Sequence, residues 1–258
     1  MKERWMPDSK IAVTLYTLRD FVQTPADIAD TLKKVKSIGY DHIQLSALGP
    51  VDPAELGAMI RDAGLHVCAT HVPFERLQEK PDEVAAEHRL WGCEHIAVGS
   101  MPRSYWDDPD GFSRFAVDAS AVALGLKEAG MSFSYHNHHT ELVRVGGRTG
   151  LAILVEESDP ALCFEIDTYW IQYGGGDPID WIGRVRDRCP VIHFKDLGVS
   201  GREQVMAEIG EGNMNWSGIV AACEAAGSQW YVVEQDTCAG DPFDSIAVSY
   251  RNMTAMEL

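Results

Sequence analysis

Short runs of apolar residues recur along the chain, and longer stretches with the apolar periodicity of a helix separate them. The short runs are rich in β-branched residues, as buried strands are. Eight of them occur, at residues 11–15, 42–45, 66–70, 95–98, 132–136, 162–166, 191–194 and 230–233. Strands that alternate with helices predict βα units that build a parallel sheet.

The intervening stretches carry the start and stop signals of helices. In residues 24–38, Thr24 and Pro25 supply an N-cap and a first-turn proline, and Gly39 can end the helix. Three other stretches begin with the same kind of signal, an aspartate before proline or glycine, at Asp52, Asp110 and Asp177. These signals predict a helix between successive strands.

The number of strands and the length of the chain predict the fold class. No linker, low-complexity tract or compositional break divides the sequence, so we expect one domain over residues 1–258. Eight βα units in one domain of this size predict an α/β protein with a (β/α)₈ TIM barrel. The alternative is a doubly wound sheet, but no glycine-rich phosphate-binding motif follows the first strand.

Composition and charge exclude some classes of partner. The 258 residues carry a net charge of −17, which opposes binding to a phosphate backbone, so no nucleic acid is expected. Six cysteines are scattered singly and predict free thiols in a reducing compartment. Residues 1–10 are polar, and no run reaches the roughly 18 apolar residues of a membrane span. We therefore expect a cytoplasmic protein with no membrane partner.

Polar side chains follow the predicted strands, at the end where a barrel places its active site. Four of them come from the last four strands, namely Glu141, Asp167, His193 and Glu234. Three carboxylates and one imidazole without a thiolate suit one divalent cation, with Mn²⁺ or Mg²⁺ favoured and Co²⁺, Fe²⁺ or Zn²⁺ also accepted. The alternative for each acidic residue alone is a helix cap or an ion pair.

Four segments resemble those of a known family: 135–138 (YHNH), 192–197 (IHFKDL), 210–213 (GEGN) and 231–236 (YVVEQD). They are similar to those of the sugar phosphate isomerase/epimerase proteins, in the xylose-isomerase-like TIM-barrel superfamily, and the resemblance covers nearly the whole chain. It implies one divalent metal on Glu141, Asp167, His193 and Glu234, with His138 as a competing donor for the first position.

The chain departs from the ketose epimerases of that family at one position. Those enzymes carry a histidine three residues after the metal-binding aspartate, where this chain has Trp170. The pattern is similar instead to the subgroup that acts on keto-sugars, keto-inositols and 3-keto-glycosides, including enzymes that cleave C-glycosides. For that subgroup the resemblance implies a base within the His-Asn-His region.

The shared chemistry is the removal of a proton from a carbon next to a carbonyl, with a metal that stabilises the developing enediolate. We expect His136 to act as the base and Glu234 and Lys195 to take part in proton transfer. Lys195 has an equal alternative in an ion pair with a nearby carboxylate. Substrate contacts are expected from His71, His138, Trp170 and Arg202, the last within a stretch at 198–215 that is either a lid or a plain surface loop.

The predicted function is therefore a divalent-metal-dependent isomerase or epimerase that acts on a keto-sugar or related polyol through an enediolate. The alternative is a metal-dependent lyase or dehydratase that acts on a 3-keto-glycoside, including C-glycoside cleavage, or on a keto-inositol. A repair endonuclease is opposed by the net charge of −17. A non-catalytic binding module would show no proton exchange with D₂O. The expected partner is a small neutral carbohydrate, and the composition is compatible with a homo-oligomer.

Overall fold

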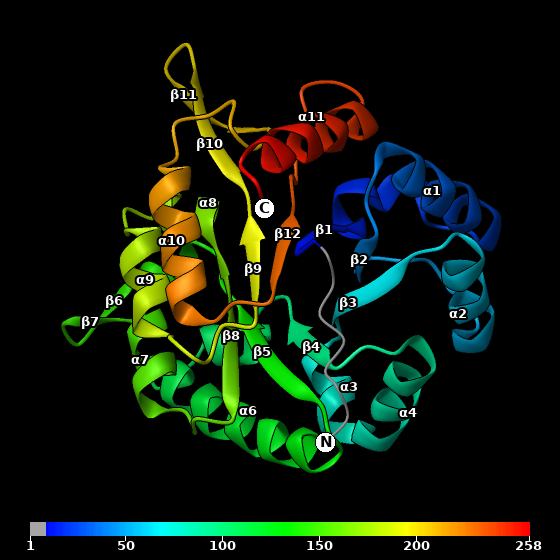
Figure 1. Cartoon of the computed structure of the whole chain (residues 1–258). Coiled ribbons are helices and arrows are strands. Elements are labelled where there is room, and N and C mark those ends of the chain that lie inside the picture. Colours follow the sequence, from blue (N-terminus) through cyan, green and yellow to red (C-terminus); the bar gives the residue numbers. More distant parts are fainter. Residues whose placement is uncertain (1–8) are drawn as a thin grey trace.

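Eight parallel strands close into a barrel in the computed structural model, which describes residues 9–258 (Figure 1). They are β1 (Ile11–Thr14), β2 (His42–Leu45), β3 (His66–His71), β4 (His95–Val98), β5 (Ser132–His136), β8 (Leu162–Asp167), β9 (Val191–Phe194) and β12 (Trp230–Val233). They follow one another around the barrel in this order, and β12 pairs with β1 to close it. The predicted barrel is confirmed. Most of the polar segment at residues 1–10 lies outside the described residues.

The predicted strands are confirmed, with small differences at their ends. The first strand ends before residue 15, because the Thr14 side chain caps the 3-10 helix η1 (Leu15–Phe21). β3 and β8 each continue one residue further than predicted, to His71 and Asp167, because both residues still pair with the neighbouring strand. These two strands thus carry polar side chains up to the rim of the barrel.

Helices surround the barrel, as Figure 1 shows. They are α1 (Pro25–Ile38), α2 (Pro53–Asp62), α3 (Phe74–Glu79), α4 (Pro81–Trp91), α5 (Arg103–Trp106), α6 (Gly111–Glu128), α7 (Gly150–Glu157), α8 (Thr168–Tyr173), α9 (Pro178–Arg184), α10 (Trp216–Ala226) and α11 (Pro242–Ala255), with a 3-10 turn η2 (Thr140–Leu142). The predicted caps Thr24, Asp52 and Asp177 each accept a first-turn backbone N–H, whereas Asp110 makes no capping hydrogen bond. None of the described helices is long and apolar enough to cross a bilayer.

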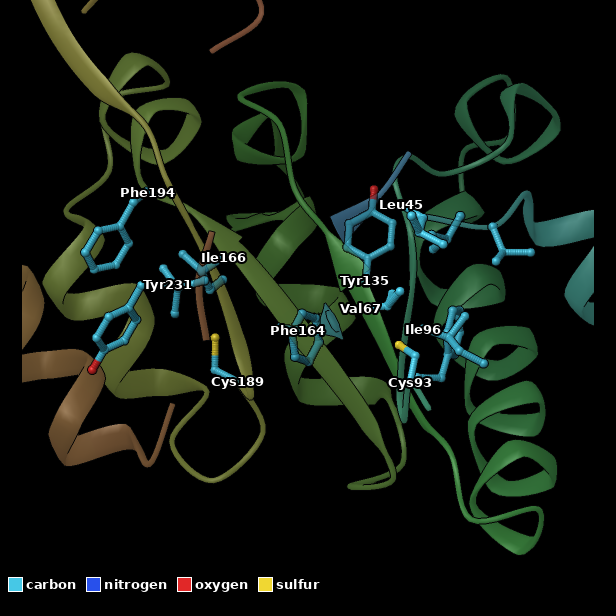
Figure 2. Close-up of a cluster of buried hydrophobic side chains, with 14 of the residues drawn as sticks. Leu45, Val67, Cys93, Ile96, Tyr135, Phe164, Ile166, Cys189, Phe194 and Tyr231 are labelled. Atoms are coloured by element: carbon cyan, nitrogen blue, oxygen red, sulfur yellow. The ribbon is translucent and has the colours of Figure 1, made fainter. Parts of the chain in front are cut away.

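The alternation of side chains along each strand separates the hydrophobic core from the candidate site. Outward side chains pack beneath the helices, and Figure 2 shows Phe164 and Ile166 of β8 in this layer together with Phe194 of β9. Glu165 lies between the two outward residues of β8, so it points into the barrel. A smaller apolar cluster lies apart from this layer, formed by Ala12, Cys68, Ala69, Val191 and Val232.

Two short antiparallel hairpins interrupt the βα pattern. One is β6 (Arg144–Val145) with β7 (Arg148–Thr149), and the other is β10 (Asp196–Ser200) with β11 (Glu203–Ala207), which extends away from the barrel in Figure 1.

The buried carboxylate of Asp196 anchors the segment after the second hairpin. It accepts five hydrogen bonds, from the backbone N–H groups of Leu197, Gly210, Gly212 and Met214 and from Nε1 of Trp216.

Candidate metal centre

Four side chains meet inside the barrel where its last strands end. His136 ends β5, Asp167 ends β8, His193 lies within β9 and Glu234 follows β12. All four are buried, and one ligand atom from each lies within 4.8 Å of the ligand atoms of the others. The group can hold a metal ion.

Four of their atoms face one another and make no hydrogen bond of good geometry, although Oδ2 of Asp167 also lies 3.1 Å from Nζ of Lys195. They are Nε2 of His136, Oδ2 of Asp167, Nδ1 of His193 and Oε2 of Glu234. Nδ1 of His193 lies 2.8 Å from Oε2 of Glu234, and Nε2 of His136 lies 3.4 Å from Oδ2 of Asp167. Buried polar atoms without partners are costly, and a cation bound between them would satisfy all four. The residues present therefore fit a divalent metal.

The other polar atom of each of these four side chains is anchored elsewhere. Oδ1 of Asp167 accepts the backbone N–H of Trp170 and caps α8. Nδ1 of His136 lies 3.2 Å from the carbonyl oxygen of Gly99. Because a carbonyl only accepts hydrogen bonds, Nδ1 of His136 is the donor in this contact, and Nε2 is the nitrogen that faces the centre.

His193 is oriented by a chain of buried polar groups that leads to the cavity. Its Nε2 lies 2.7 Å from Oε1 of Gln44, and Nε2 of Gln44 donates to Oε1 of Glu165 at 2.7 Å. Oε2 of Glu165 lies 2.6 Å from Nε2 of His71, whose Nδ1 lies 3.3 Å from Oγ of Ser46. Supporting hydrogen bonds of this kind fix the ring orientation and tautomer of a ligating histidine.

Glu165 and Gln44 were not among the predicted site residues. Burial raises the pKa of the Glu165 carboxyl, but His193 and His71 outweigh this effect and hold the pKa below its usual value. The sequence contained an indication that Glu165 points into the barrel. Glu165 stands two residues before Asp167 in an apolar strand, so the two side chains lie on the same face of the strand. Glu165 also forms a second group of possible metal ligands, with His71 and His193.

A register shift explains why His71 points into the barrel. The pairing of β2 with β3 steps from Ile43 opposite Val67 to Gln44 opposite Ala69, so Cys68 is an extra residue. Such a bulge reverses the alternation of the residues that follow it. His71 consequently faces Glu165 inside the barrel.

Lys195 is enclosed by carboxylates. Its Nζ lies 2.8 Å from Oε1 of Glu234 and 3.1 Å from an oxygen each of Asp167 and Asp236. Burial lowers the pKa of Lys195, but the three carboxylates outweigh burial and raise the pKa above its usual value. The ion pair named as the alternative for Lys195 is thus present, and the ammonium group stays charged.

Glu141 does not join the buried group. Its Oε1 accepts the hydroxyl of Tyr135 at 2.5 Å, and its Oε2 accepts the backbone N–H of His138 and the hydroxyl of Thr140, both at 3.0 Å. The carboxylate therefore holds the turn after β5, and the buried group contains His136 in addition to the three other predicted ligands.

A cavity of about 960 Å³ opens beside this group. The residues that line it at this end are His71, His136, His138, Trp170, Glu234 and Asp236. Burial, together with neighbouring His136, lowers the pKa of His138 to about 3, so its ring is neutral. Arg202 is exposed in the turn between β10 and β11, and no residue of 198–215 lines the cavity. The structure thus brings three of the four expected substrate-contacting residues to the cavity and leaves Arg202 outside.

Comparisons with known proteins agree with this architecture. The xylose isomerase-like TIM barrel model matches residues 32–249. A sugar phosphate isomerase/epimerase from Parabacteroides distasonis ATCC 8503 superposes with a TM-score of 0.82 at 20% identity, covering 99% of this chain and 96% of that one. A second structure of that name and organism gives 0.79 at 25% identity, over 95% and 98% of the two chains.

A curated relative adds a third comparison. The inosose dehydratase of Geobacillus kaustophilus (strain HTA426) is 26% identical over 193 residues, which cover 64% of this chain and 61% of that protein. The match with the family model spans well over half of the chain. The chain belongs to the xylose isomerase-like TIM barrel family.

Proposed function

We propose that the protein is a divalent-metal-dependent isomerase or epimerase that acts on a keto-sugar or related polyol through an enediolate. The observation that carries the proposal is the set of four buried ligand atoms, at or near the carboxyl ends of four barrel strands, that face one another without hydrogen bonds of good geometry. The names of the similar proteins from Parabacteroides distasonis support the sugar chemistry.

The donor set bears on the choice of cation. His136 and His193 contribute two imidazole nitrogens beside the carboxylates of Asp167 and Glu234. Nitrogen donors suit Mn²⁺, Fe²⁺, Co²⁺ and Zn²⁺ better than Mg²⁺, which prefers oxygen. With His136 in place of Glu141, Mg²⁺ becomes the weaker candidate, and Mn²⁺, Fe²⁺, Co²⁺ and Zn²⁺ all fit the donor set.

The residues around the centre have different roles in the proposed reaction. When bound, a divalent cation polarises the carbonyl and hydroxyl oxygens of a substrate and offsets the charge of the enediolate. Glu234 lines the cavity, and we assign the proton transfer to it. Nε2 of His136 serves either as a metal ligand or as the base. If it is a ligand, Glu234 is the base. Lys195 does not line the cavity and is assigned the positioning of Glu234 and Asp236.

A dehydratase or lyase is the second candidate, and the similarity to the inosose dehydratase favours it. Such a reaction needs the same proton abstraction and, in addition, an acid that protonates the leaving hydroxyl or aglycone. Burial raises the pKa of Asp236 to about 6 in spite of the nearby Lys195, and Asp236 lines the cavity. We assign the acid to Asp236 in this case.

The test combines metal analysis with isotope exchange. We expect one equivalent of metal in the wild-type protein, loss of it in Glu234→Gln, and retention of it in the matched variant Glu141→Gln. In D₂O with a panel of keto-sugars and keto-inositols, we expect deuterium on carbon in a product of unchanged composition, or loss of water for the second candidate. Loss of metal in Glu141→Gln would restore that residue as a ligand. A metal-free wild-type protein without exchange would overturn the proposal.

A further inference from the structure

The outer face of α6 is apolar, whereas the solvent-facing side of a surface helix is ordinarily polar or charged. Figure 1 shows this helix on the outside of the barrel. Between residues 115 and 126 its exposed positions are Val117, Ala121, Leu124 and Gly125, none of which carries a charge. Val117 is 65% exposed, more than any other large apolar side chain among residues 9–258. A surface of this kind is typical of a contact with another protein.

Two opposite charges flank the apolar positions. Arg114 lies one turn before Val117, and Glu128 lies one turn after Leu124. The spacing of three and four residues keeps both charges on the same face of the helix as the apolar positions. This face, the α6 stripe, consists of Arg114, Val117, Ala121, Leu124 and Glu128. The Arg114 side chain is 54% exposed although it also pairs with Asp108, and Glu128 is exposed.

The α6 stripe carries no net charge. Asp118, the one charged residue between residues 115 and 126, accepts a hydrogen bond from the hydroxyl of Tyr105 at 2.7 Å and so is held beside the stripe. The whole chain has a net charge of −17, so two copies repel each other over most of their surfaces. A neutral face with one positive and one negative end therefore favours contact with a second copy.

The α6 stripe is complementary to itself. In an antiparallel pair of α6 helices with a two-fold axis at Ala121, residues equally far before and after Ala121 lie opposite each other. Arg114 and Glu128 are both seven residues from Ala121, so each arginine would face the glutamate of the second copy. Val117 would face Gly125 in the same way, and a Cβ at Gly125 would meet nothing beyond its own helix within 4 Å. This open space can take the Val117 side chain of the second copy.

We infer that the protein forms a two-fold dimer through the α6 stripe. The inference goes beyond the proposed function, because no residue of the stripe lines the cavity. The 18 residues of α6 span roughly 27 Å, so one pair of these helices forms a contact at the small end of the range for specific interfaces. We therefore expect a dimer in measurable equilibrium with the monomer.

Sedimentation velocity at increasing protein concentration tests the dimer. We expect the wild-type mass to rise from the 28.5 kDa of one chain towards twice that value. Val117→Asp should raise the dissociation constant at least about tenfold, because it buries a carboxylate against an apolar surface. The matched control is Val199→Asp on β10, at a position with 62% exposure, which should associate as the wild type does. A wild type that stays monomeric, or equal dissociation constants of the two variants, overturns the inference.

A charge exchange tests the antiparallel arrangement. Arg114→Glu gives the stripe two acidic ends and Glu128→Arg gives it two basic ends, so each variant alone places like charges opposite each other and should associate more weakly. An equal mixture pairs acidic ends with basic ends and should form a mixed dimer about as readily as the wild type. A mixture that associates no better than either variant alone refutes the arrangement. Thermal melts establish that the variants are folded, and the Val117→Asp test does not depend on Arg114 and its contact with Asp108.

Discussion

Replacing Gln44 by leucine tests whether the buried chain behind His193 prepares the ligand atom. In the wild type, Oε1 of Gln44 accepts from Nε2 of His193, so Nε2 keeps its proton and Nδ1 is the nitrogen that can bind a metal. Without this acceptor, the ring keeps a buried N–H unsatisfied at a cost of ~1–3 kcal/mol or moves the proton to Nδ1. A proton on Nδ1 would face Oε2 of Glu234 at 2.8 Å and would compete with a metal.

The expected loss of affinity follows from this competition. Removing a group that orients a metal-binding histidine typically weakens binding 10–100-fold, which is about 1.4–2.7 kcal/mol. We expect the dissociation constant of Gln44→Leu for Mn²⁺ to rise by that factor, as measured by equilibrium competition with a chelating dye. The circular dichroism spectrum should remain that of the folded wild type.

The matched control is Gln235→Leu, which removes an equally buried glutamine side chain that hydrogen-bonds to Glu208 and to the carbonyl of Thr237. It should change Mn²⁺ affinity by less than about threefold. If folded Gln44→Leu binds Mn²⁺ within about threefold of wild type, the tautomer argument is wrong. If both variants lose affinity equally, the effect is a general loosening of the barrel.

Three further predictions concern stability. Asp196→Asn leaves buried N–H donors without an acceptor, so it should cost about 3 kcal/mol and lower the melting temperature by roughly 6–12 °C. The control variant Asp241→Asn, at an exposed helix cap, should change the melting temperature by under about 2 °C. Equal melting temperatures of the two variants would refute this prediction. Gly150→Ala would place a Cβ against the ring of Phe112 and should cost about 1–3 kcal/mol, and an unchanged thermal melt would count against that packing. Burial lowers the pKa of His42 from 6.5 to about 4, so between these pH values the unfolded chain binds a proton that the folded chain does not. Stability is therefore lost as the pH falls through this range. His42→Gln should flatten the decline of the melting temperature with falling pH, and parallel curves for the variant and the wild type would contradict this prediction.

The sequence predicted the barrel because its strands are local features. Runs such as residues 191–194 are apolar and β-branched, and start signals such as Thr24-Pro25 act within one turn, so neither depends on distant contacts. The inward faces at Asp167, His193 and Glu234 follow from the same alternation. These three residues were predicted as ligands and lie together in the barrel.

Features that depend on pairing between segments were harder to predict. The extra residue in β3 is visible only from its register with β2, and that register decides where His71 points. Glu141 follows a turn, and its contact with the Tyr135 hydroxyl depends on how the turn folds back on β5. The stretch at 198–215 was considered as a lid, but pairing between β10 and β11 carries Arg202 away from the cavity.

The double use of the Asp167 carboxylate has a thermodynamic consequence. One oxygen caps α8 through the backbone N–H of Trp170, and the other belongs to the candidate metal group. Ligand binding and the order of this helix are therefore linked through one side chain, and such linkage is reciprocal. A cation at the centre should slow proteolysis and hydrogen exchange in α8, and mutations that fray α8 should weaken metal binding to the same extent. The wall of the cavity that contains Trp170 would then become ordered together with the metal centre.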